Sequence, residues 1–158
     1  MKPATLPQIK KELQYRSTED LLNLCLRLAR FKKENKELLT YLLFESHDES
    51  GYIESVKREI DEQLEAINTQ NYYWIRKSIR KILRTVKKYI RYSLKKETEV
   101  ELLLYFCVQL KNFSPSIKRD KTLQNILERQ LVLIRKTIKG LHEDLQYDYN
   151  LSLEQQGF

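Results

Sequence analysis

The sequence predicts an all-α protein, a single domain of six to eight helices arranged in antiparallel hairpins. Apolar residues recur at steps of three and four almost from end to end, which is the spacing of one helix face. The chain has only 3 Gly and 3 Pro in 158 residues, too few turn-forming residues for a protein with many β-hairpins. The segments between the periodic stretches are short and polar. A chain of this length can bury one substantial core.

The first half of the chain predicts four helices. Ser17, followed by Asp20 three residues later, resembles a capping box, and a leucine stripe follows it. The run LLTYLLF supplies the next helix, and the cap-rich segment SHDESG ends it. The fourth helix has aliphatic residues on one face and acidic residues on the others. The predicted ranges are 7–14, 18–31, 35–46 and 52–67.

The second half predicts three more helices, at 72–96, 98–112 and 117–139. The first of these carries isoleucines at helical spacing. The second, VELLLYFCVQL, is apolar nearly all round and is expected to be the most buried element. Ser114 and Pro115 end it, because the residue before proline is pushed out of helical geometry. Gly140 is expected to cap the third in a left-handed conformation.

These helices define an all-helical domain over residues 1–142. The remaining segment, 143–158, has four acidic residues and no Lys or Arg. Chain ends are commonly mobile, so we expect this acidic stretch to be partly docked or disordered. Its charge would let it fold back over a basic helix and screen it.

An internal similarity appears when the chain is shifted by 82 residues. The segment from Glu19 to Phe31 then aligns with the segment from Glu101 to Phe113, with Glu, Leu, Cys and Phe in common. Half of this shift lies in the period range of HEAT and armadillo repeats, although the middle hairpin does not align. The architecture is therefore either a small bundle or a short HEAT-like α-superhelix. The other interpretation is that two leucine-rich helices share a composition by chance.

Sequence motifs give no support for an enzyme. His47 and His142 stand in acidic settings without the i, i+3 or i, i+4 spacing of metal ligands on a helix. Three scattered glycines cannot build a phosphate-binding loop. Both cysteines, Cys25 and Cys107, have aliphatic neighbours and are expected to be buried free thiols. We predict no catalytic residue, no metal site, no cofactor and no small-molecule substrate.

The location expected from the sequence is the cytoplasm. No run of 18 uncharged apolar residues occurs, and the first residues lack the apolar core of a signal peptide. Two cysteines are too few for a disulfide framework. A membrane-spanning segment is therefore not expected.

One segment could identify a class of partner. Between Asn71 and Lys96 the chain has ten basic residues and no acidic residue, so the rest of the chain carries a net charge of −3 out of a total of +7. The candidate polyanion-binding residues are Arg76, Arg80, Lys81, Arg84, Lys87, Lys88, Arg91 and Lys95. Aromatic residues alternate with them, and the candidates for stacking on bases are Tyr73, Trp74 and Tyr92.

Three interpretations of the basic helix follow. In the first, the acidic helix 52–67 neutralises it, with Glu59, Glu62 and Glu65 near Arg76, Arg80 and Arg84. The protein is then a non-enzymatic helical binding or scaffold module for an unknown protein partner. In the second, helix 72–96 binds a nucleic-acid backbone. In the third, the helix docks on an acidic protein or an anionic membrane surface, which requires a free apolar face.

Overall fold

A computed structural model of the protein describes all 158 residues and confirms the all-α prediction, with helices and no strands. The chain forms two compact units, Met1–Phe44 and Glu45–Phe158. No helix combines the length and apolar character needed to cross a membrane. The domain limits predicted from the sequence, 1–142 and 143–158, stay predictions, because a grouping of contacts does not measure which parts fold cooperatively.

The N-terminal unit contains α1 (Leu6–Leu13), α2 (Thr18–Phe31) and α3 (Lys33–Thr40), and a π-helical turn (Tyr41–Glu45) begins at its end. The Ser17 side chain accepts a hydrogen bond from the Asp20 backbone N–H at 3.1 Å, so the predicted start of α2 is confirmed. The Asn35 amide donates to the Leu28 carbonyl at 2.8 Å and joins α2 to α3. None of these three helices contains a buried residue.

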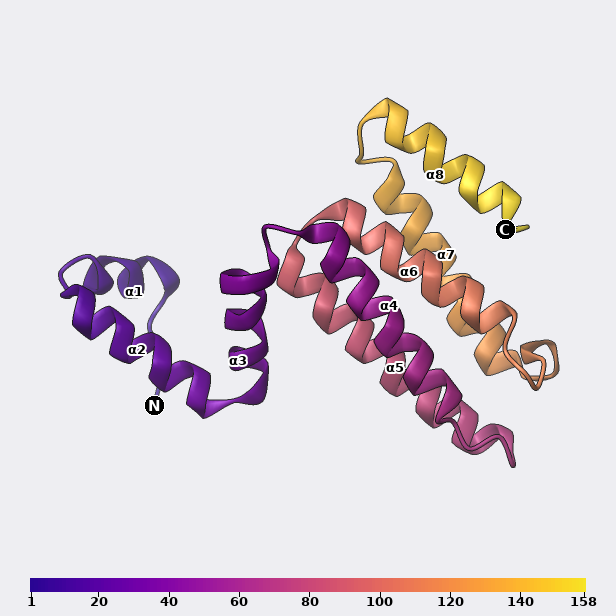
Figure 1. Cartoon of the computed structure of the whole chain (residues 1–158), viewed down its shortest axis with the longest axis horizontal. Helices are drawn as coiled ribbons and strands as arrows, with labels where there is room; N and C mark the ends of the chain where they lie inside the picture. The colour runs from indigo at the N-terminus through magenta and orange to yellow at the C-terminus, as the bar shows by residue number, and fades with distance from the viewer. The chain divides into compact units, whose positions relative to one another are not determined.

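The C-terminal unit contains α4 (Glu49–Glu65), α5 (Tyr72–Ser93), α6 (Lys96–Lys111), a 3₁₀ turn (Ile117–Arg119), α7 (Lys121–Ile138) and α8 (Glu143–Gln155). Consecutive helices run antiparallel, as predicted (Figure 1). Helices α4, α5 and α6 contact one another, α7 packs along α6, and α8 packs on α7. This unit is a small helical bundle.

The core of the bundle is centred on α6, as its composition predicted. Its fully buried side chains include Leu102, Leu103 and Phe106. α5 contributes Ile75 and Ile79 to the same core. Burying a side chain of this size stabilises a fold by about 1.5–3 kcal/mol, so the apolar face of α5 is held firmly in the bundle.

The basic helix is shorter than predicted, because α5 ends at Ser93. Leu94 adopts a left-handed conformation with φ 59°, and Lys95 occupies the N-cap position of the next helix. The Glu49 carboxylate accepts hydrogen bonds from the hydroxyls of Ser93 and Thr98, and Lys95 Nζ lies 2.8 Å from it. These contacts tie the α5–α6 turn to the start of α4 and end the helix there.

Both ends of α7 also differ from the predictions. Gly140 is not left-handed, since the only residues with positive φ are Leu94 and Gly157. The Gly140 N–H instead donates to the Thr137 carbonyl at 3.0 Å in an ordinary turn. α7 begins at Lys121, after the predicted start at 117, because Asp120 caps it.

The acidic stretch at the C-terminus forms helix α8 and buries Leu153. Its Tyr149 hydroxyl donates to Glu101 of α6 at 3.2 Å, and Lys111 of α6 donates to the Gly157 carbonyl at 3.1 Å. It packs on α7 and does not cover α5, where Lys77, Arg80, Lys81, Arg84 and Arg91 stay exposed. The prediction that it screens them is therefore wrong.

The two cysteines have different environments. Cys107 is fully buried in α6, as predicted, and burial raises the pKa of its thiol to about 12. Cys25 is exposed, so that prediction is wrong. It lies on α2, none of whose residues is buried. The similarity between α2 and α6 therefore does not extend to their environments.

Candidate polyanion-binding face

Helix α5 separates an aliphatic face from a basic one. Ile75, Ile79, Ile82 and Val86 are buried on one side. At about 100° per residue, seven basic residues fall within a sector about 120° wide on the opposite side, along about 21 Å of helix. We call this set the basic face: Lys77, Arg80, Lys81, Arg84, Lys87, Lys88 and Arg91.

The position of this face follows from the local sequence. The Asn71 side chain accepts a hydrogen bond from the Trp74 backbone N–H at 3.2 Å and starts the helix. The buried aliphatic residues recur at steps of three and four and fix which side faces the bundle. Because α5 contains no acidic residue, no pair within the helix can neutralise the opposite side.

The acidic helix α4 does not neutralise the basic face as the first interpretation requires. Glu59 accepts hydrogen bonds from the Tyr89 hydroxyl at 2.8 Å and the Gln63 amide at 2.9 Å. Asp61 accepts one from the Tyr105 hydroxyl at 2.6 Å. These carboxylates face tyrosines, and the predicted pairs of Glu59, Glu62 and Glu65 with arginines of α5 do not form.

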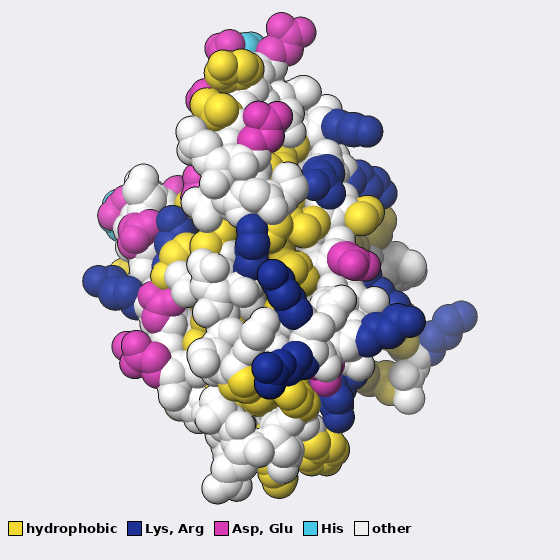
Figure 2. Space-filling view, turned by 90° about the vertical axis from the view of Figure 1, so that its right-hand side faces the viewer, with side chains coloured by type: hydrophobic (Ala, Val, Ile, Leu, Met, Phe, Trp, Pro, Cys, Tyr) yellow, Lys and Arg dark blue, Asp and Glu magenta, His cyan; other side chains and the backbone are white.

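Exposure and pairing distinguish members of the basic face. Lys77, Arg80, Lys81, Arg84 and Arg91 are exposed, and none of them has a carboxylate within 4 Å. Lys87 and Lys88 are half-buried. Figure 2 shows many Lys and Arg side chains exposed on the side of the bundle turned to the viewer, with a few acidic side chains among them.

Two predicted candidates lie outside this face. Arg76 pairs with Asp120, the N-cap of α7, at 2.7 Å. Lys95 is in the α5–α6 turn and pairs with Glu49. Both side chains therefore hold helices of the bundle together. No local sequence pattern indicates the Arg76 contact, because its two members are 44 residues apart.

The aromatic candidates differ in their exposure. Tyr73 and Trp74 are 59% and 41% exposed at the start of α5, with their rings 5.1 Å apart edge to face. Lys77 Nζ lies 5.2 Å from the centre of the Trp74 ring, a cation–π distance. Tyr92 is only 9% exposed and packs against Tyr89, so its ring cannot stack on a base.

No group of three or more His, Cys, Asp or Glu side chains is placed to hold a metal ion. Comparisons of the chain with protein-family models, with curated proteins and with solved structures found no match. The basic face is therefore the feature of the structure that bears on function.

Proposed function

We propose that the protein is a non-enzymatic binding module whose basic face binds the phosphate backbone of a single-stranded nucleic acid. The observation that carries the proposal is the group of five exposed cations on α5 without a carboxylate within 4 Å. They extend in one line along one side of a rigid helix. The regularly spaced phosphates of a nucleic-acid backbone match such a line of cations.

Electrostatics favour a polyanion as the ligand. Neighbouring cations at i, i+3 and i, i+4 on a helix are about 5–6 Å apart and repel one another. A nucleic acid removes this repulsion and releases its own condensed counterions on binding, which is the main driving force for backbone contacts. Arg80 and Arg84 lie near the middle of the face, so we expect them to contribute most.

The fixed apolar face of α5 argues against insertion into a membrane. A basic amphipathic helix binds a bilayer by burying its apolar side among the lipids. In this protein that side is packed in the bundle, with Ile75 and Ile79 fully buried. Only the cations and the aromatic pair remain available to a ligand.

The aromatic pair favours single strands over a duplex. Tyr73 and Trp74 are exposed at one end of the basic face, where an unpaired base can stack on either ring. Such stacking contributes about 1–3 kcal/mol per base and tolerates any sequence. A duplex keeps its bases stacked on one another and gains nothing from these rings.

The test compares two double variants with the same net charge. Arg80→Glu with Arg84→Glu removes the centre of the basic face, whereas Arg58→Glu with Arg129→Glu changes exposed arginines of α4 and α7. Each lowers the net charge from +7 to +3. Fluorescence anisotropy with a labelled single-stranded oligonucleotide should show affinity lost at least tenfold more in the first variant than in the second, both remaining folded by circular dichroism.

Other outcomes contradict the proposal. Equal losses in the two double variants would mean that net charge and not the basic face drives binding. Equal affinity for poly-glutamate would indicate an acidic protein as the ligand, and tighter binding to vesicles of anionic lipid would indicate a membrane. No binding to any oligonucleotide at low salt would leave the scaffold interpretation, in which a protein partner binds elsewhere.

A further inference from the structure

The N-terminal unit exposes an apolar surface that none of its own helices covers. On α2, Leu28 and Phe31 are 58% and 76% exposed, and no residue of α1, α2 or α3 is buried. Tyr41 is the only buried residue in this unit of 44 residues, so the unit has little hydrophobic stabilisation of its own. A contiguous apolar surface of this kind indicates an interface with another molecule.

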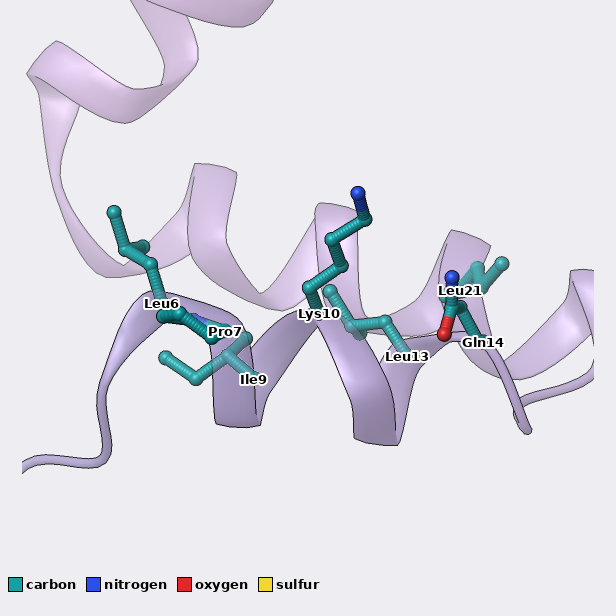
Figure 3. A pocket seen from close by; sticks show the side chains of 7 residues that line it. All are labelled: Leu6, Pro7, Ile9, Lys10, Leu13, Gln14 and Leu21. Atoms are coloured by element: carbon teal, nitrogen blue, oxygen red, sulfur yellow. The ribbon is translucent and has the colours of Figure 1, made fainter.

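The apolar residues of α2 have the spacing of a helix-pairing seam. Leu21, Leu24, Leu28 and Phe31 follow one another at steps of three, four and three. This is the a and d pattern by which two helices pack along their length. The apolar face of α1 continues the surface beside Leu21, where Leu6, Ile9 and Leu13 line an open groove (Figure 3).

The charges at the two ends of α2 fit a second α2 in the opposite direction. Asp20 lies next to the seam in the first turn, and Lys32 and Lys33 follow the last turn. An antiparallel pair puts the acidic end of each copy beside the basic end of the other. A parallel pair would put like charges together, which is unfavourable.

We propose that the chain self-associates through α2, which pairs antiparallel with α2 of a second copy. Leu24 then lies beside Leu28 of the other copy, and Leu21 lies beside Phe31. The α1–α2 hairpins of the two copies together form a four-helix arrangement in which their apolar faces meet. This register buries the surface that the isolated unit leaves open.

The same register makes a prediction about Cys25. In this register the twofold axis crosses α2 at residue 26, one residue after Cys25. The two Cys25 residues are therefore offset along the helix axis by about 3 Å, at 1.5 Å per residue. Cys25 follows the d position Leu24 and is therefore an e position, and e positions of antiparallel helices face one another across the seam. Its exposed thiol is thus a reporter of the pairing.

The test uses two substitutions of leucine by aspartate in the same helix. Leu28→Asp places a charge in the seam. Leu26→Asp places the same charge on an exposed leucine at the opposite side of α2, where Leu26 is 43% exposed. Both variants have the same helix propensity and net charge, so they differ only in the face that is changed.

Sedimentation equilibrium from about 1 to 100 µM should show the wild-type chain and Leu26→Asp shifting toward twice 19.1 kDa, since small interfaces bind at micromolar concentrations. Leu28→Asp should remain monomeric. A short bis-maleimide should cross-link two chains through Cys25 in the first two proteins, and not in Leu28→Asp or Cys25→Ser. A wild-type chain that stays monomeric at 100 µM, or cross-linking that persists in Leu28→Asp, would overturn the proposal.

Discussion

The Asp120 carboxylate makes two contacts that no sequence pattern indicates, and we expect both to stabilise the bundle. The substitution Asp120→Ala tests this expectation. One oxygen of its carboxylate accepts a hydrogen bond from the Leu123 backbone N–H at 3.0 Å and caps α7. The other oxygen lies 2.7 Å from the guanidinium of Arg76 on α5. Asp120 is only 7% exposed, so water cannot replace either contact without local opening.

The expected loss follows from these two contacts. Removing an N-cap costs about 0.5–2 kcal/mol. Removing a hydrogen bond to a charged group costs about 1.5–3 kcal/mol, because Arg76 loses its acceptor. Since the two contacts share one carboxylate, we expect a combined loss of about 2–4 kcal/mol in the free energy of unfolding. Asp120→Asn keeps a capping oxygen and should cost less than Asp120→Ala.

Urea unfolding followed by circular dichroism measures the loss. With a slope of about 2 kcal/mol per M, the midpoint of Asp120→Ala should fall by about 1–2 M. Asp144→Ala, in the first turn of α8, is the control, because its carboxylate is 92% exposed and should contribute at most about 0.5–1 kcal/mol. An unfolding free energy of Asp120→Ala within 0.5 kcal/mol of the wild type would refute the reasoning.

Two further predictions concern buried groups of the bundle. In a Cys25→Ser background, Cys107 should resist a thiol reagent in the folded protein, because burial raises the pKa of its thiol to about 12. A rapid reaction of Cys107 would show that α6 opens readily. Burial and the neighbouring Asp61 carboxylate raise the pKa of Tyr105 from 10.0 to about 12, so the folded state holds this proton more tightly than the unfolded state. Stability should therefore decline as the pH rises from about 10 to 12. In melting curves recorded over this pH range, the stability of Tyr105→Phe should decline less steeply than that of the wild type. The same pH dependence in both proteins would contradict the raised pKa of Tyr105.

Helical periodicity was sufficient to predict the fold class and most helices. The steps of three and four reflect burial on one face, and α2 at Thr18–Phe31 matches its predicted range. The end of α5 could not be predicted, because it depends on Glu49, which lies 44 residues before Ser93 in the chain. Contacts of this range leave no local pattern in a sequence.

The candidate site was predicted in part. Charge density located the basic helix, and spacing placed seven of its cations on one side. Spacing alone could not show that Arg76 and Lys95 form ion pairs within the bundle, nor that Tyr92 is buried. The apolar stripe around Cys25 predicts a core face, and spacing cannot correct this, because a stripe that faces a partner has the same period as one that faces the chain's own core.

The salt dependence of oligonucleotide binding tests the central claim most directly. If the basic face contacts about four to six phosphates of a single strand, the logarithm of the affinity should fall with the logarithm of salt concentration at a slope of about −3 to −4. The Arg80→Glu, Arg84→Glu variant should show a slope shallower by at least 1, while the Arg58→Glu, Arg129→Glu control keeps the wild-type slope. A wild-type slope near zero, or the same slope in all three proteins, would contradict binding through the basic face.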